Sequence, residues 1–252
     1  MEPRRYGMAY GLLLALVLVF LALNICIGSV KIPLAEVWQI LRGGDGTGAD
    51  IVLRLRLPRA LAALILGGGL ALSGYLLQTF FHNPIAGPFI LGVSSGAKLM
   101  VAVVMVFALG RAFALSSWAL ILAAFAGAML SMGFVLLMAR LVDRMSILII
   151  SGVMIGYICS AVTDFVVTFA DDADIVNLHN WSKGSFSGVT WQNVGVMGAV
   201  ILLAFLGTFL LSKPIGAYQL GEGYARSVGV NVGLFRGLLG ILSSVLAACV
   251  TA

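Results

Sequence analysis

The side chains that could do chemistry in this sequence form no recognisable catalytic or metal-binding set. Cys26, Cys159 and Cys249 each lie inside an apolar run, and no two of them stand at metal-ligand spacing. We interpret them as small packing residues. A glycine-rich loop ending in lysine, which would cradle phosphate, is also absent from the sequence. We therefore expect no catalysis, no nucleotide binding, no metal and no cofactor.

Two charged residues stand within apolar runs, where an ionised group is costly and is usually functional or paired. At a rise of about 1.5 Å per residue, Lys98 lies ~12 Å into its run and Asp164 ~25 Å into another. We do not expect these two residues to pair. They could contact a charged substrate along a pathway, or they could snorkel or be buried against backbone carbonyls, and both interpretations remain open.

The elements that must position these residues are membrane helices. Hydrophobic residues make up 61% of the 252 residues and charged residues 10%, against roughly a quarter charged in soluble domains. Each apolar run approaches or exceeds the ~20 residues that a helix needs to cross the hydrocarbon, and helices satisfy their own backbone in lipid. Seven spans are predicted, at residues 7–28, 60–80, 90–109, 113–138, 147–170, 192–211 and 233–252.

The predicted fold is therefore an all-α, polytopic membrane helix bundle, with residues 1–252 forming a single transmembrane domain. Its 31 glycines include the four-residue pairs Gly92 with Gly96, Gly152 with Gly156, and Gly233 with Gly237. Such pairs leave bare patches on one helix face, so neighbouring helices can approach closely. The net charge of +5 is spread over the loops, which favours contact with lipid headgroups and protein partners over nucleic acid.

A basic cluster complicates the orientation. With a cytoplasmic amino terminus, residues 29–59 form an extracytoplasmic loop, and each side of the membrane carries seven positive residues. The positive-inside rule therefore returns a tie, which is caused by Arg54, Arg56 and Arg59. These arginines could dock acidic side chains of an external partner, because a guanidinium grips a carboxylate through two hydrogen bonds. Ordinary headgroup contact is the alternative.

Residues 213–232 are predicted to form a cytoplasmic coupling segment that carries a short amphipathic helix. Glu222 and Arg226 stand four residues apart in the favourable acid-first order. Gly229 is a natural helix stop, and Asn231 can cap the next span. An apolar stripe lies beside the charged pair: Leu220, Tyr224 and Val228. The helix suits transmission of force from a soluble partner, or it lies on the headgroups.

Four stretches of the sequence, in their order and spacing, are similar to the FecCD and BtuC type permeases of ATP-binding-cassette importers for siderophores, haem and cobalamin. They are RLPR (Arg56 to Arg59), LALSGYLLQ (Leu70 to Gln78), NPIAGPFILGVSSGA (Asn83 to Ala97) and LGEGYARSVGVNV (Leu220 to Val232). The resemblance extends from about Val30 to the end of the chain. It implies a bacterial, multi-pass cytoplasmic-membrane subunit that transports an iron-siderophore complex, or haem or cobalamin, and is not an enzyme.

The resemblance also implies partners and site residues. The partners are a second permease copy or a paired permease, two ATP-binding-cassette ATPase subunits, an extracytoplasmic substrate-binding protein and the lipid bilayer. Binding-protein docking falls on Arg56 and Arg59. ATPase coupling falls on Leu220, Gly221, Glu222, Ala225, Arg226 and Gly229. The gate and pathway fall on Asn83, Pro84, Ile85, Ser94, Ser95, Met145 and Ser146. Gly87 departs from the family, which usually has an acidic residue there.

Family members continue beyond the seventh span, so we expect this chain to be a fragment of a ten-helix subunit. Two other functions stay open at this point. One is a proton-coupled secondary transporter that uses Asp164 and Lys98, and the other is a seven-helix receptor without flux.

Overall fold

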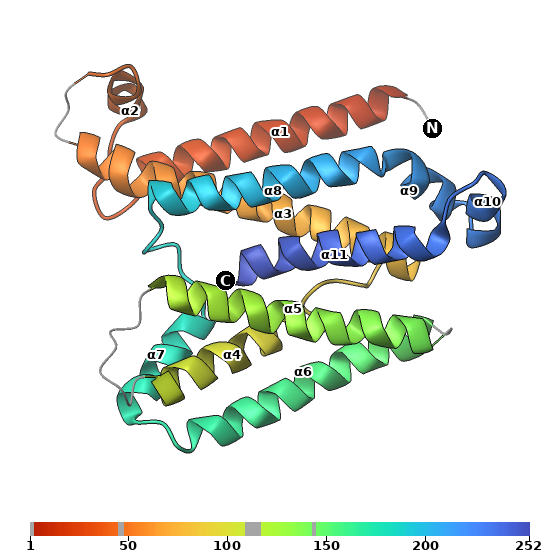
Figure 1. Ribbon diagram of the computed structural model, residues 1–252. Coiled ribbons are helices and arrows are strands. Elements are labelled where there is room, and N and C mark those ends of the chain that lie inside the picture. Colours follow the sequence, from red (N-terminus) through yellow and green to blue (C-terminus); the bar gives the residue numbers. More distant parts are fainter. Residues whose placement is uncertain (1–2, 45–47, 109–116, 143–144) are drawn as a thin grey trace. The chain divides into compact units, whose positions relative to one another are not determined.

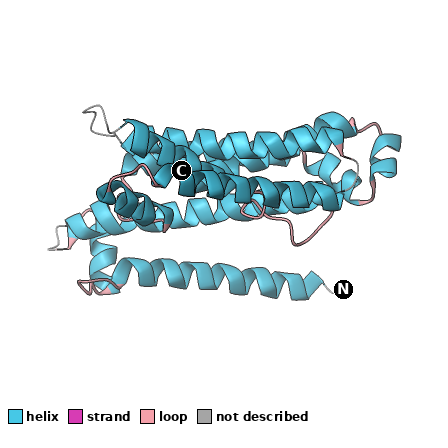
Figure 2. Ribbon diagram, turned by 90° about the horizontal axis from the view of Figure 1, so that it is seen from below, coloured by secondary structure: helices cyan, strands magenta, loops and turns pink. Residues whose placement is uncertain are grey.

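The computed structural model describes residues 3–44, 48–108, 117–142 and 145–252, which fold into helices joined by turns (Figure 1). No strand occurs among these residues (Figure 2). The all-α class predicted from the apolar runs is confirmed.

Six helices in the described part of the chain are long and apolar enough to cross a membrane. They are α1 (Pro3–Cys26), α3 (Leu57–Phe81), α5 (Ser117–Leu141), α6 (Met145–Val167), α8 (Trp191–Leu210) and α11 (Val232–Thr251). Each matches one of the predicted spans. The chain is a multi-pass membrane protein.

The remaining predicted span, at 90–109, is the shorter helix α4 (Val93–Ala108), with 16 residues in the described chain. The predicted span began before the helix does. Gly92 has a left-handed backbone, with φ 74°, and this conformation cannot be part of a right-handed α-helix, so α4 begins only after it. A Cβ atom at Gly92 would also come within 2.8 Å of the backbone nitrogen of Gly156. Only glycine therefore meets both demands at this position.

The chain divides into two compact units. The first contains residues Met1–Ile65 and Phe186–Val196. Its connection after α1 carries α2 (Leu34–Leu41) and a π-helical segment, η1 (Ile51–Arg56), which leads directly into α3. Its apolar core is small and consists of Ile25, Ile32, Val37, Ile40, Val52 and Ala60.

The second unit contains residues Leu66–Ser185 and Met197–Ala252. Within it α4 packs against α5 and α6, and α5 packs against α11 (Figure 1). The connection after α6 carries α7 (Asp172–Ser182), which contacts α4. The connection after α8 carries α9 (Ser212–Gln219) and α10 (Glu222–Ser227), which pack on one another.

Glycines allow the close packing of α4. A Cβ atom at Gly96 would overlap Ser131 and the carbonyl oxygen of Gly127 on α5. A Cβ atom at Gly152 of α6 would lie 2.7 Å from the side chain of Leu91. Two of the three predicted glycine pairs therefore mark helix contacts. The third does not, because a Cβ atom at Gly237 would meet no described atom within 4 Å.

Candidate functional site

The 213–232 segment contains two short helices where the sequence predicted one. Gly221 separates α9 from α10 with a backbone φ of 117°, a conformation that favours glycine. The other helix signals are confirmed. Gly229 follows the end of α10, and the Asn231 side chain accepts a hydrogen bond of 3.1 Å from the backbone nitrogen of Leu234 at the start of α11.

One face of this segment is apolar and exposed, and the opposite face is fixed to the protein. The exposed fractions of Leu220, Tyr224 and Val228 are 72%, 50% and 53%. Ala225, by contrast, is fully buried. The predicted apolar stripe therefore faces away from the rest of the chain, whereas the side of α10 that carries Ala225 is packed against it.

The Glu222 carboxylate is held from three sides. Its Oε1 accepts a hydrogen bond of 3.1 Å from the Tyr218 hydroxyl and lies 3.4 Å from Nη1 of Arg236 on α11. Its Oε2 lies 3.7 Å from Nη2 of Arg226, so the ion pair predicted from the four-residue spacing is confirmed. The sequence reasoning missed both Tyr218, which stands four residues before Glu222 but across the break at Gly221, and Arg236, which stands fourteen residues after it on α11.

Tyr218 is the fully buried centre of these contacts. Its ring centroid lies 5.1 Å from that of Phe235. Burial raises the pKa of Tyr218 to about 12; the Arg236 charge acts in the opposite direction, and Glu222 adds to the rise. The phenol is therefore neutral at any growth pH, and its hydroxyl can donate a hydrogen bond to the Glu222 carboxylate.

The turn at residues 82–88 follows the end of α3 and contains three predicted gate residues. The Asn83 side-chain oxygen accepts a hydrogen bond of 2.9 Å from the backbone nitrogen of Ile85, an arrangement in which asparagine fixes its own turn. Pro84 and Ile85 are exposed, Ile85 by 75%. This turn thus presents an apolar tip on a locally rigid backbone.

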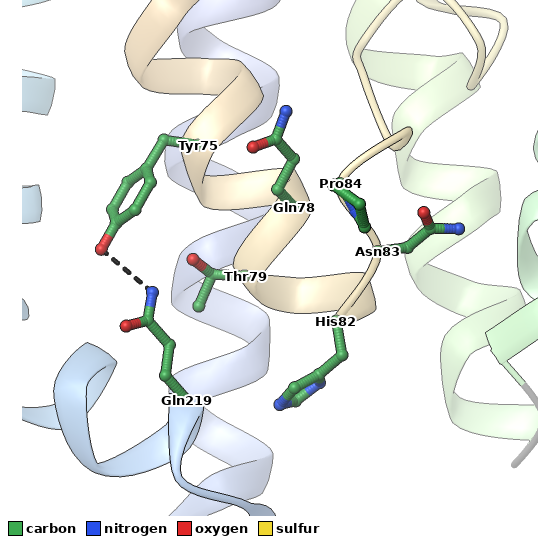
Figure 3. A pocket seen from close by; sticks show the side chains of 7 residues that line it. All are labelled: Tyr75, Gln78, Thr79, His82, Asn83, Pro84 and Gln219. Atoms are coloured by element: carbon green, nitrogen blue, oxygen red, sulfur yellow. Dashed lines mark hydrogen bonds between the residues drawn. The ribbon is translucent and has the colours of Figure 1, made fainter.

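His82, at the start of this turn, contacts the 213–232 segment directly. Its Nε2 lies 3.2 Å from the carbonyl oxygen of Tyr218, and the two ring centroids are 4.6 Å apart. Beside this contact is a cavity of about 250 Å³ (Figure 3), where the Gln219 amide donates a hydrogen bond of 3.2 Å to the Tyr75 hydroxyl. Its lining residues are Tyr75, Gln78, Thr79, His82, Asn83, Pro84 and Gln219.

The structure therefore brings Asn83 and Pro84 together with the 213–232 segment, but it leaves the other pathway candidates elsewhere. Ser94 and Ser95 are half-buried at the start of α4. Ser95 accepts a hydrogen bond of 3.4 Å from Ser160 of α6. Met145 and Ser146 are the first two residues of α6, and their side chains lie outside the described part of the chain.

The two predicted docking arginines lie in the first unit and have different surroundings. Arg56 is only 8% exposed. Its guanidinium donates to the carbonyl oxygens of Ile25 (2.7 Å) and Cys26 (3.1 Å) and to that of Val30. Because α1 ends at Cys26, Arg56 caps the helix where cations are favoured.

Arg59 and Arg54 are more exposed to solvent than Arg56. Arg59 is half-buried and donates a hydrogen bond of 2.7 Å to the carbonyl oxygen of Ser187. Arg54 is exposed and lies 3.0 Å from Asp50 in a surface ion pair. Sequence reasoning treated the arginines as one cluster, whereas the fold gives Arg56 an internal role.

The two charges within predicted spans remain apart. Lys98 on α4 is half-buried, Asp164 on α6 is exposed, and no ion pair joins either of them to another described residue. Among all the residues that the structure describes, no group of three or more His, Cys, Asp or Glu side chains is placed so that it could hold a metal ion.

Comparisons with known proteins agree on one family. The model of the FecCD transport family matches residues 14–252. The chain is 39% identical over 231 residues to the vitamin B12 import system permease protein BtuC of Klebsiella pneumoniae subsp. pneumoniae. It is 37% identical over 224 residues to that of Salmonella typhi. These matches cover 91% and 89% of this chain, which spans 66% of the length of each relative.

A solved structure has the same fold. It is described as an inward-facing conformation of a metal-chelate type ABC transporter, and it matches with a TM-score of 0.82 at 26% sequence identity. The match covers 97% of this chain and 74% of that one.

Proposed function

The chain belongs to the FecCD transport family, and from this premise we propose that it is a permease subunit of a binding-protein-dependent ATP-binding-cassette importer in a bacterial cytoplasmic membrane. Its partners are two ATPase subunits, an extracytoplasmic substrate-binding protein and a second permease copy or a paired permease. Its own work is mechanical, and ATP hydrolysis belongs to the partner subunits.

The proposed cargo is a cobalamin-type metal chelate. The relatives at 39% and 37% identity are vitamin B12 permeases, and the similar solved structure is described as a metal-chelate type transporter. Ferric siderophores and haem are the alternative cargoes. Uptake of radiolabelled cyanocobalamin, measured against an iron-loaded hydroxamate siderophore and iron-labelled haem, distinguishes the three.

The proposed coupling site is the 213–232 segment, in which Leu220, Gly221, Glu222, Ala225, Arg226 and Gly229 contact or shape the surface for the ATPase. The observation that carries this proposal is the exposed apolar stripe, of which Tyr224 is 50% exposed, on a helix whose first residue is held by Tyr218, Arg226 and Arg236. A rigid apolar surface can seat in a partner's groove and transmit its displacement. Nucleotide can bias two conformations only through such differential contacts.

The 82–88 turn is the proposed cytoplasmic gate, with Asn83, Pro84 and Ile85 at its centre, and Ser94, Ser95, Met145 and Ser146 further along the pathway. Ile85 is 75% exposed on a turn fixed by the Asn83 side chain. An exposed apolar tip of this kind can close against an equivalent tip of a second copy.

Binding-protein docking is proposed at Arg59, with Arg56 as the second predicted contact. Arg59 is half-buried and donates a single described hydrogen bond, to the carbonyl oxygen of Ser187. Arg56 already donates to three backbone carbonyls. Contact of Arg56 with an acidic partner therefore requires exchange of these internal hydrogen bonds for external ones.

The test is reconstitution in liposomes of the subunit with the ATP-binding-cassette and binding-protein subunits of its own genome. Cyanocobalamin uptake should require ATP and the binding protein. Uptake that persists without ATP but collapses with the proton gradient would instead identify a secondary transporter that uses Asp164 and Lys98. Failure to co-purify ATPase subunits, together with no uptake of any of the three cargoes, would identify a receptor.

A further inference from the structure

We infer that His82 is a positioning residue that holds the 82–88 turn to the 213–232 segment, so that movement of the segment displaces the turn. This inference rests on the proposed function, because it names the contact through which a coupling segment would reach a gate. His82 itself touches neither cargo nor ATPase in this assignment; it acts through Tyr218 and Asn83.

The polar contact has a defined direction. A carbonyl oxygen can only accept, so His82 carries a proton on Nε2 when it bonds the Tyr218 carbonyl at 3.2 Å. The same carbonyl accepts a hydrogen bond of 3.0 Å from the backbone nitrogen of Gly221, and its two lone pairs accommodate both donors. The His82 ring is therefore attached at the point where α9 ends and the break before α10 begins.

The position of His82 in the backbone makes this attachment consequential. Its φ is 47°, a left-handed conformation that non-glycine residues adopt rarely and histidine more often than most. Asn83 follows immediately, and its backbone nitrogen bonds back to the Gln78 carbonyl at 3.2 Å. Only the side chain of His82 lies between the Tyr218 carbonyl and the turn, so a displacement of α9 reaches the turn through this one residue.

A second set of contacts joins the same two elements. Glu222 lies 3.4 Å from Arg236, whose guanidinium carbon lies 5.3 Å from the centroid of the Phe80 ring on the last turn of α3. Glu222 also accepts from Tyr218, which holds His82. The first residue of α10 is thus connected to the end of α3 by two routes, one through His82 and one through Phe80.

His82 is not a core residue. Its side chain is exposed and lines the cavity beside Gln219 (Figure 3). Removal of its ring creates no internal void. We therefore expect His82 variants to insert and to assemble with the ATPase, which allows coupling to be measured separately from folding.

The experiment compares two substitutions of His82 in the reconstituted complex, with cyanocobalamin as the transported probe. His82→Gly removes the ring and accepts the left-handed backbone. His82→Gln keeps an N–H donor at similar reach. We expect His82→Gly to lower the cargo moved per ATP hydrolysed by about five-fold, the scale of one lost hydrogen bond, with ATPase co-purification unchanged. His82→Gln should restore most of this ratio.

His179→Ala is the matched control, because His179 is the other histidine of the chain and lies exposed on α7. Its ratio should equal that of the wild type. A double variant, His82→Gly with Glu222→Gln, tests whether the two residues act through one set of contacts. Residues in one network are non-additive, so the double variant should lose little more than the larger single loss.

Each outcome decides the inference. A wild-type ratio of cargo to ATP in His82→Gly would overturn it, as would losses that multiply in the double variant. Absence of ATP-dependent uptake of cyanocobalamin, siderophore and haem by the wild-type complex would overturn the proposed function and the inference with it. ATP-dependent uptake that is indifferent to His82 would overturn the inference alone.

Discussion

The hydroxyl of Tyr218 donates a hydrogen bond of 3.1 Å to the carboxylate of Glu222 across the break that separates α9 from α10. Gly221 makes the break, and the bond links the two helices across it. The two short helices also pack on one another, and the apolar stripe of Leu220, Tyr224 and Val228 is exposed on this segment.

Replacement of Tyr218 by phenylalanine should separate this bond from the packing of the ring. Tyr218→Phe keeps the contact with Phe235 but leaves Glu222 with its two arginines. We expect a loss of about 1 kcal/mol in unfolding free energy, against about 3–5 kcal/mol for Tyr218→Ala, which also empties a buried site. Thermal unfolding in detergent measures both. Equal losses in the two variants would contradict the role of the hydroxyl.

The raised pKa of Tyr218 predicts a loss of stability in alkali. A tyrosine that titrates near 10 in the unfolded chain and at about 12 in the folded chain stabilises the fold fully below pH 10. That contribution declines as pH rises from about 10 to about 12, because the unfolded state releases its proton first. Melting temperatures measured across this window should fall more steeply for the wild type than for Tyr218→Phe. Parallel curves would contradict the assignment.

We predict that Arg56 contributes mainly to stability, as a cap of the carboxyl end of α1. Arg56→Ala leaves the carbonyl oxygens of Ile25 and Cys26 without their donor, at a cost of about 1–3 kcal/mol. Arg54→Ala is the matched control, because its ion pair with Asp50 is exposed on both sides and contributes about 1 kcal/mol or less. An Arg56→Ala protein as stable as Arg54→Ala, with weakened affinity for the binding protein, would instead favour docking.

Replacement of glycine by alanine in α5 should lower stability at Gly127 but not at Gly133, six residues away. A Cβ atom at Gly127 would overlap the carbonyl oxygen of Gly96 on α4, whereas one at Gly133 would meet no described atom within 4 Å. Gly127→Ala should therefore force α4 and α5 apart and lower the melting temperature. Gly133→Ala should leave it unchanged or raise it slightly, since alanine favours helix by up to about 1 kcal/mol. A similar effect of both substitutions would contradict this packing.

Asp164→Asn provides a test between primary and secondary transport. Asp164 is exposed and has no ion-pair partner among the described residues, so the variant should unfold at the wild-type temperature. Uptake should keep its dependence on ATP and its insensitivity to a protonophore. A variant that loses all uptake together with a proton-driven component of the wild type would favour proton coupling.

The sequence by itself determined the class of protein, its spans and the helix ends that depend on local chemistry. Long apolar runs must become helices in lipid because the backbone has no other partner there, and six of the seven were confirmed. The Asn231 cap and the ion pair of Glu222 with Arg226 were predictable for a different reason, because both are local contacts along the chain. Each depends on residues three or four positions apart.

Only the tertiary structure decided which distant residues meet. The contact of His82 with Tyr218 joins residues 136 positions apart, and that of Arg56 with Ile25 joins residues 31 positions apart. Neither leaves a periodic signal, because a side chain reaching a backbone carbonyl needs no particular residue type at the acceptor. The same fact explains why three arginines that look equivalent in the sequence became a helix cap, a surface ion pair and a half-buried donor. Their roles follow from the carbonyls and carboxylates that the fold brings within reach.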